Sequence, residues 1–316
     1  MRFTNDPKEC NLITHAGVFH ADDVLSTVIL SEILEDPVVM RTFKVPNELP
    51  EGAIVYDIGM GQYDHHQPNA QMRENGITYC SFGLLWNSGF GYQYLMKILP
   101  DADRVLLAAV VAKSVDKKFV QGVDARDNGQ QIPKEVIADF SGLISFYNPS
   151  WDSADDENEA FEKACRVTKE LLDRICINEY SKARAREEIR FMREANCFMP
   201  MSDCPEHVFI MDKFVPWQEY LSELDPDGTI WYVIFPSKRG GWNVQCVPVE
   251  LGSYEQKAPI PDGWKGHPAA CGIDGCTFIH NSGFLSAFKT IEGAKDFAEK
   301  AATRHIETMK GLEVIR

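Results

Sequence analysis

Long hydrophobic runs are missing from this sequence. No apolar stretch in its 316 residues approaches the ~20 residues that a membrane-spanning helix needs. The start of the chain, Met-Arg-Phe-Thr-Asn-Asp-Pro-Lys-Glu-Cys, also lacks the apolar core of a signal peptide. From these two absences we expect a cytoplasmic protein that has no membrane partner.

Positive charge is scarce. The chain has 32 Lys and Arg against 47 Asp and Glu, a net charge of −15. Non-specific binding to duplex DNA uses large basic surfaces, so this balance argues against it, although a short strand can still be held locally in a cleft. Many carboxylates are also what a site for several cations requires.

Two further signatures are absent. The nine cysteines are odd in number and scattered over the chain, which suits a reducing compartment better than a disulfide framework. There is no Walker loop, and Gly59-Met60-Gly61 is followed by Asp64 where a dinucleotide-binding motif would have its third glycine. We therefore do not expect chemistry on a nucleotide cofactor.

The stretch that stands out is residues 54–67. Ile54-Val55-Tyr56 is typical of a buried strand, Asp57 falls at its end, and two glycines break the pattern. Three further polar residues follow within ten positions, namely Asp64, His65 and His66. In isolation, these residues could equally be a turn aspartate and a surface histidine pair.

A second polar cluster lies upstream. Residues 11–14 predict a strand and residues 24–34 a helix, and the loop between them carries His15, His20, Asp22 and Asp23. The two aspartates fall at the helix start, where carboxylates are favoured as caps in any case. Capping does not explain the two histidines.

Both clusters are expected at one sheet edge. Residues 38–43 and 53–57 predict two more strands, and this alternation indicates an α/β fold with a mostly parallel sheet and helices on both faces. Ligands bind at the carboxyl edge of such sheets. We therefore predict a metal site, most simply a binuclear one, that gathers His15, His20, Asp22, Asp57, Asp64, His65 and His66. This mixture of His and Asp without Cys favours Mn²⁺, and less strongly Mg²⁺, Co²⁺, Fe²⁺ or Zn²⁺.

A third acidic segment follows two predicted helices, residues 79–99 and 104–115. Asp124 and Asp127 precede Asn128-Gly129, a turn signal, so we expect residues 119–129 to form a loop. Two solvated charges at a turn are one interpretation. Beside the first two clusters, one of these aspartates is also a candidate metal ligand, and the sequence does not choose between them.

These motifs together resemble the Myg-one (melanocyte proliferating gene one) family, a branch of the DHH phosphoesterases. The resemblance runs from about residue 11 to about residue 300 and is carried, in order, by residues 15–23, 55–59, 63–67, 123–129, 240–249, 261–266 and 278–284. It implies a two-domain metallo-phosphoesterase, and for this branch a 3′-to-5′ exonuclease acting on RNA.

The resemblance also implies roles for single residues. His15, His20 and Asp22 match the first motif, with a His where most of the superfamily has an Asp. Asp57 matches the second motif, Asp64-His65-His66 the third, and Asp124 or Asp127 the fourth. We expect two Mn²⁺ ions on this set, with Mg²⁺ or Co²⁺ as substitutes. We assign catalytic roles to Asp23, Asp64 and His66, of which His66 is expected to face the substrate.

The rest of the chain suggests a division into domains. We expect a DHH-like catalytic domain over residues 1–152, a long helical bridge over 153–198, and a smaller α+β substrate-binding domain over 199–316. In the last domain, strands are predicted at 208–211, 230–235, 242–249 and 276–280, and a helix at 290–309. Arg184 and Arg186 on the bridge could face RNA, although a solvated helix face is the simpler interpretation.

Substrate contacts are expected from two C-terminal segments. The first is Lys238-Arg239-Gly240-Gly241-Trp242, where a Gly-rich basic turn can approach a phosphate and the Trp can stack on a base. An ordinary hairpin turn with a core Trp is the alternative. The second is His280-Asn281-Ser282, which the resemblance favours. His267, Cys271, Cys276 and His280 have the residue types of a Cys₂His₂ zinc site, but their spacing is not that of a finger.

The function we predict is metal-dependent hydrolysis of single-stranded RNA or short oligonucleotides by an exonuclease. Two rivals remain: a hydrolase of a small phosphoanhydride or dinucleotide, and a non-catalytic protein that binds metal or RNA. The sequence is also compatible with a homodimer.

Overall fold

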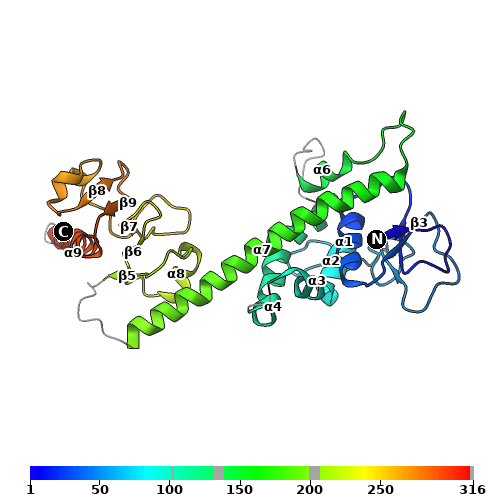
Figure 1. Ribbon diagram of the computed structural model, residues 1–316, viewed down its shortest axis with the longest axis horizontal. Helices are drawn as coiled ribbons and strands as arrows, with labels where there is room; N and C mark the ends of the chain where they lie inside the picture. The colour runs from blue at the N-terminus through cyan, green and yellow to red at the C-terminus, as the bar shows by residue number, and fades with distance from the viewer. Residues whose placement is uncertain (101–102, 131–138, 199–206, 314–316) are drawn as a thin grey trace. The chain divides into compact units, whose positions relative to one another are not determined.

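The computed structural model describes residues 1–100, 103–130, 139–198 and 207–313 (Figure 1). The chain divides into two compact units, Met1–Ala183 and Arg184–Arg316. The division falls within α7 (Glu157–Phe198), which is the long helix that we expected as a bridge. In the described part of the chain, no helix is both long and apolar enough to cross a membrane.

The first unit contains an all-parallel sheet of four strands in the order β1-β3-β2-β4. These are β1 (Arg2–Phe3), β2 (Leu12–His15), β3 (Val38–Thr42) and β4 (Ile54–Val55). The predicted α/β fold with a parallel sheet is confirmed. The sequence did not indicate β1, because two residues give no periodicity to detect.

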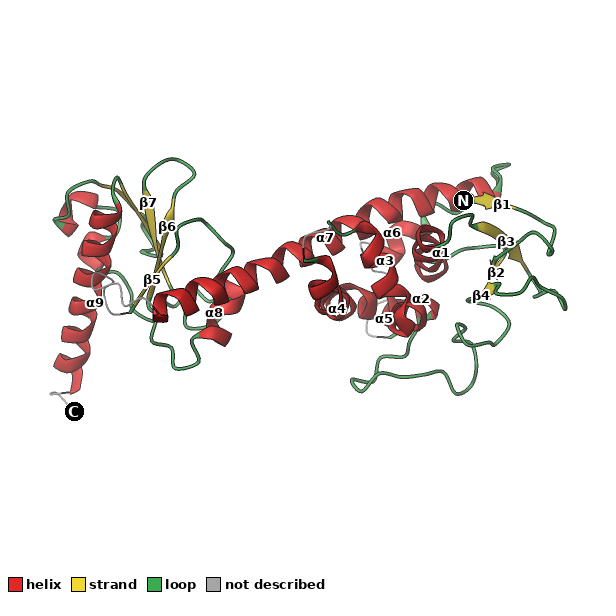
Figure 2. Cartoon of the chain, turned by 60° about the horizontal axis from the view of Figure 1, so that its bottom comes forward, coloured by secondary structure: helices red, strands yellow, loops and turns green. Residues whose placement is uncertain are grey.

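Helices pack on the sheet through alternate strand residues. Leu12 and Val39 belong to the main core cluster, together with Tyr56 and most of α1 (Ala21–Ile33). Figure 2 shows α1 beside the strands. Val55 and the loop residue Val45 both lie close to Gly59. The apolar side chains of these strands therefore pack with α1 in one core cluster.

The middle of the first unit consists of short helices with π-helical turns between them. These segments are α2 (Ser81–Leu85), η1 (Trp86–Phe90), α3 (Gly91–Ile98), α4 (Arg104–Val115), η2 (Asp116–Val120), α5 (Gln121–Asp127) and α6 (Phe140–Ser145). The predicted loop over residues 119–129 was wrong. The chain stays helical to Asp127, and only Asn128 and Gly129, with φ of +66° at the glycine, end the helix.

The second unit is the predicted α+β one. Its mixed five-stranded sheet has the order β5-β6-β7-β9-β8. Its elements are β5 (Val208–Ile210), α8 (Gln218–Leu224), β6 (Tyr232–Pro236), β7 (Trp242–Cys246), η3 (Asp262–Trp264), η4 (Pro268–Cys271), β8 (Cys276–Ile279), β9 (Leu285–Phe288) and α9 (Ile291–Glu313). The sequence missed β9, which is held by pairing with β7 and β8 rather than by its own pattern.

Candidate metal centre

The polar clusters of the first unit meet at the carboxyl edge of its parallel sheet. β2 ends at His15, and Asp57 follows β4, which pairs with β2 directly. The connection from β2 leads to β3 on one side, while β4 lies on the other side. Such a reversal of strand order opens a crevice between the two loops. His15 and Asp57 come from the two sides of that crevice.

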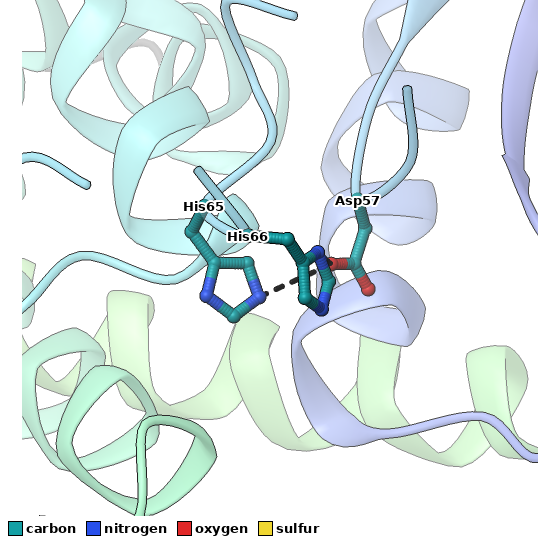
Figure 3. A group of neighbouring side chains, drawn as sticks. All are labelled: Asp57, His65 and His66. Atoms are coloured by element: carbon teal, nitrogen blue, oxygen red, sulfur yellow. Dashed lines mark ion pairs between the residues drawn. The ribbon is translucent and has the colours of Figure 1, made fainter. Parts of the chain in front are cut away.

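Asp57 is shared by two groups of candidate ligands. One of its carboxylate oxygens lies 3.3 Å from His15 Nε2, and the other lies 3.2 Å from His65 Nε2. Asp23 joins the first group, where its Oδ2 is also 3.3 Å from His15 Nε2. His66 joins the second. Figure 3 shows the Asp57 carboxylate facing the two imidazoles of the second group.

A third group lies next to the other two. It consists of His20, which precedes α1, Asp22 in the first turn of α1, and Asp127 at the end of α5. His65 connects this group to Asp57, because its Nε2 also lies 3.2 Å from an oxygen of Asp127 and 3.7 Å from one of Asp22. The eight side chains therefore form one continuous cluster of imidazoles and carboxylates.

Several buried atoms of the cluster have no hydrogen-bond partner among the described residues. They are both carboxylate oxygens of Asp22, Oδ2 of Asp23, Oδ1 of Asp57 and Nε2 of His65. Leaving such atoms unsatisfied in a protein interior costs about 1–3 kcal/mol each. Carboxylate oxygens and imidazole nitrogens are ligands for hard and intermediate divalent cations. The cluster therefore fits metal ions through the chemistry of its donors and through these unsatisfied atoms.

The pKa values show how much negative charge is concentrated here. Burial raises the pKa of Asp23 to about 7, and burial together with Asp57 and Asp127 raises the pKa of Asp22 well above its usual value. Burial works against charging Asp57 as well, but the close imidazoles of His15 and His65 outweigh it and lower its pKa to about 2. Without cations, the cluster thus offsets its charge by holding extra protons.

Asp23 has two roles at once. Its Oδ1 accepts a hydrogen bond of 2.9 Å from the backbone N–H of His20, which is the capping role expected at a helix start. Its other oxygen points at His15. Asp22, by contrast, makes no capping bond, and both of its oxygens are buried without partners in the described structure. Helix capping therefore explains one oxygen of Asp23 and neither oxygen of Asp22.

Asp64 lies outside the three groups. One of its oxygens accepts a 2.6 Å hydrogen bond from the Met60 backbone, and the other accepts a 2.7 Å bond from Nδ1 of His66. These bonds tie the loop and orient the His66 ring, whose remaining nitrogen is left for other partners. The structure thus places Asp64 behind His66.

The structure separates the two aspartates of α5. Asp127 faces His65, as described above. The fully buried Asp124 instead accepts hydrogen bonds from Arg73, at 2.6 and 3.0 Å, and from the N–H and thiol of Cys80, at 3.1 and 3.0 Å. A Cβ at residue 83 would come within 2.2 Å of Asp124, so only Gly83 leaves room for its carboxylate. Both oxygens of Asp124 are therefore already hydrogen-bonded to Arg73 and Cys80.

Sequence reasoning did not find Arg73. Its guanidinium joins Asp124 to Asp116, 51 and 43 residues away along the chain, and nothing in its local sequence announces partners at that distance. Sequence reasoning also missed Asn128, whose side-chain oxygen lies 3.4 Å from Nδ1 of His65. The Asn-Gly turn signal drew attention to the backbone of Asn128 rather than to its amide.

Five of the predicted substrate-binding residues line one cavity of about 880 Å³ in the second unit. They are Lys238, Arg239, Gly240, Gly241 and His280. The basic pair lies at the tip of the hairpin between β6 and β7. A Cβ at residue 241 would come within 2.2 Å of the Phe288 carbonyl oxygen, which explains the second glycine. The Ser282 N–H donates to Nδ1 of His280, so the other nitrogen of this ring carries the proton when the ring is neutral.

The other C-terminal candidates lie elsewhere. Trp242 packs against the core cluster of the second unit, and neither Asn281 nor Ser282 lines the cavity. The four residues of the hypothetical zinc site do not gather as ligands within the described chain. Of these, Cys271 donates its thiol to the Pro268 carbonyl oxygen at 3.0 Å.

Comparison with known proteins identifies the family of this chain. A family model described as Uncharacterised protein family (UPF0160), labelled as the MYG1 exonuclease family, matches residues 11–302. The chain belongs to this family. Sequence similarity to its members extends along the chain, so both units are covered by the resemblance that the motifs predicted.

Individual members of the MYG1 exonuclease family show the same extent of similarity. The MYG1 exonuclease of Homo sapiens is 30% identical over 90% of this chain and 84% of its own length. The MYG1 exonuclease of Rattus norvegicus is 31% identical over 90% and 82%. The MYG1 protein of Schizosaccharomyces pombe is 27% identical over 92% and 96%.

Proposed function

We propose that this protein is a metal-dependent phosphodiesterase that removes nucleotides from the 3′ end of single-stranded RNA and uses two Mn²⁺ ions. The observation that carries the proposal is the sharing of Asp57 between two ligand groups that also contain unsatisfied buried atoms. A carboxylate shared in this way is what a pair of cations on one phosphoryl group requires.

The chain's own residues account for several parts of the reaction. His15 and Asp23 on one side of Asp57 and His65 on the other would hold the cations, with Asp127 of the adjoining group beside His65. Bound cations would supply charge neutralisation at the phosphoryl group and activation of the attacking water. His66, which Asp64 orients, borders cavities on both sides of the cluster and is placed to donate a proton or stabilise the scissile phosphate.

The substrate and direction rest on other support. The mammalian relatives are named exonucleases, and the resemblance of the motifs implies RNA and the 3′ end. Net charge of −15 disfavours long-range capture of duplexes but leaves local capture of a strand. Lys238 and Arg239 beside the C-terminal cavity are the basic side chains we assign to the RNA backbone.

The test is product analysis with metal-stripped protein. Single-stranded RNA labelled at its 5′ or 3′ end, and separately pyrophosphate, would be incubated with and without Mn²⁺. We expect Mn²⁺-dependent release of mononucleotides from the 3′ end. Phosphate from pyrophosphate with intact RNA would contradict this in favour of a phosphoanhydride hydrolase. Metal-dependent thermal stabilisation with no product would indicate a binding protein.

A further inference from the structure

Three exposed apolar side chains lie on one side of the proposed metal centre. Val18 lies on the loop after β2, Phe43 follows β3, and Met60 lies on the loop after β4. Their exposed fractions are 66%, 83% and 65%. Single exposed apolar residues are ordinary. Here, however, three successive loops at the same sheet edge each contribute one.

These side chains line a single cavity of about 420 Å³. Its other wall includes His15, Asp57, Asp64 and His66 of the site described above. The volume falls within the range of about 300–1,000 Å³ that is typical of small-molecule sites. The cavity is thus apolar and aromatic on one side and borders the phosphoryl-binding cluster on the other.

The backbone holds this apolar wall in place. Met60 has a φ of +55°, a conformation that non-glycine residues rarely adopt, and its N–H donates to Asp64. The Phe43 ring lies against Gly17, where φ is +85° and an added Cβ would come within 3.3 Å of the ring. The strain at Met60 is of a kind that persists where surrounding contacts fix it and that clusters at ligand sites.

We propose that Phe43, flanked by Val18 and Met60, stacks on an unpaired nucleobase next to the scissile phosphate. This inference rests on the proposed function and assigns a contact to the unpaired base beside the scissile phosphate. An occupant of the cavity must present a flat apolar surface to Phe43 and an anionic group to the metal-binding cluster, and a nucleotide does both. A base within a duplex would have both faces covered by its neighbours.

A second cavity next to the metal-binding cluster offers room for the rest of the RNA strand. His20 and His66 line the cavity that contains Phe43. The same two histidines also line a second cavity of about 480 Å³, together with Arg126, Ser141 and Ser145. The two cavities therefore adjoin through the same two histidines. With the scissile phosphate at the cluster, the stacked base would lie in the cavity that contains Phe43. The nucleotide on the other side of that phosphate would lie in the cavity that contains Arg126.

A kinetic experiment separates stacking from general apolar packing. Nucleotide release would be measured for wild type, Phe43→Ala, Phe43→Trp and Phe191→Ala, on single-stranded RNA with intact or abasic terminal nucleotides. Phe191 is a matched control, because it is 70% exposed and lines none of the cavities described above. We expect Phe43→Ala to lower kcat/KM on intact RNA by about 5- to 150-fold, mainly through KM. Phe43→Trp should restore it, and Phe191→Ala should match wild type.

The abasic substrate provides the decisive comparison. It should be a poor substrate for wild type, and Phe43→Ala should lower its turnover no further, because the stacked base is already missing. An equal loss on intact and abasic RNA would overturn the inference, as would a Phe43→Ala variant that behaves like Phe191→Ala. Either result leaves the proposed function standing if wild type still releases nucleotides.

A binding experiment tests the same contact without hydrolysis. RNA carrying 2-aminopurine at its 3′ end would be added to metal-stripped protein, and fluorescence quenching would report stacking. We expect quenching with wild type and Phe43→Trp, and its loss with Phe43→Ala. Quenching that survives Phe43→Ala would refute the inference. Quenching by wild type with no hydrolysis in Mn²⁺ would instead count against the proposed function alone.

Discussion

The imidazole of His15 and the carboxylate of Asp57 face each other from the ends of two neighbouring parallel strands, with 3.3 Å between Nε2 and Oδ2. Each residue lies where its strand ends, so the pairing of β2 with β4 brings the two together. The opposite oxygen of Asp57 contacts His65 at 3.2 Å. The Asp57 carboxylate is the ligand that the two halves of the proposed two-metal centre share.

The change Asp57→Asn tests whether the two metal sites share this carboxylate. Because the amide removes the shared negative charge and keeps the size, we expect Mn²⁺ affinity and nucleotide release to fall by at least about 100-fold. The far-UV circular dichroism should stay as in wild type. Asp36→Asn is the control, since Asp36 is exposed and outside the cluster. Unchanged turnover in Asp57→Asn would refute the assignment.

Asp124 and Asp127 should respond in opposite ways to replacement by Asn. Asp124→Asn weakens a buried pair with Arg73, so we expect a loss of about 3–5 kcal/mol in the free energy of unfolding. Asp127→Asn should lower Mn²⁺ affinity by about 10- to 100-fold with little loss of stability. Urea denaturation and calorimetric Mn²⁺ titration measure the two effects. The reverse pattern would make Asp124 the ligand.

The stability of the metal-free protein should fall as pH rises through the neutral range. The pKa of Asp23 is raised to about 7 mainly by burial, so the stability gained from its proton is lost as pH rises through that value. Burial lowers the pKa of His15, but Asp57 and Asp23 outweigh it and raise the value to about 9. The stability from this proton is full below the ordinary value near 6.5 and is lost as pH rises through about 9.

Thermal melts in EDTA and in Mn²⁺ over this range measure the effect. In EDTA we expect the Tm to decline as pH rises, and Asp23→Asn should remove the part of the decline near pH 7. In Mn²⁺ the Tm should not decline, because cations replace the protons and bind better as the ligands deprotonate. A Tm that rises with pH in EDTA would show that other groups control stability here.

The basic hairpin of the second unit can be tested through salt. Replacing Lys238 and Arg239 with Ala should weaken binding of single-stranded RNA and make the plot of log affinity against log salt shallower by about 0.7 for each charge removed. Binding of Mn²⁺ should not change. Lys163→Ala, an exposed change on α7, serves as the control. A salt slope that stays as in wild type would exclude contact between this pair and the RNA backbone.

The sequence predicted the elements of the fold that have a clear apolar pattern of their own. β2, α1 and β3 follow clear apolar patterns, and the predicted strands and helix match to within a few residues. The elements it missed or misjudged depend on distant partners. β9 is held by β7 and β8, and α5 is extended through a region whose Asn-Gly signal marks only its end.

For the candidate site, the sequence by itself determined which candidate donors come together at one edge of the sheet. Asp57, His65 and the His15–Asp23 loop follow from strand ends, because side chains at the carboxyl edge of a parallel sheet converge. Only the tertiary structure decided the surroundings of residues one helical turn apart. Asp124 and Asp127 lie three positions apart on α5, and their surroundings alone distinguish them. Arg73 and Cys80 neutralise and bind the first, while the second meets His65. A buried carboxylate takes whichever positive charge or donor the fold brings to it, and that partner comes from a remote part of the chain.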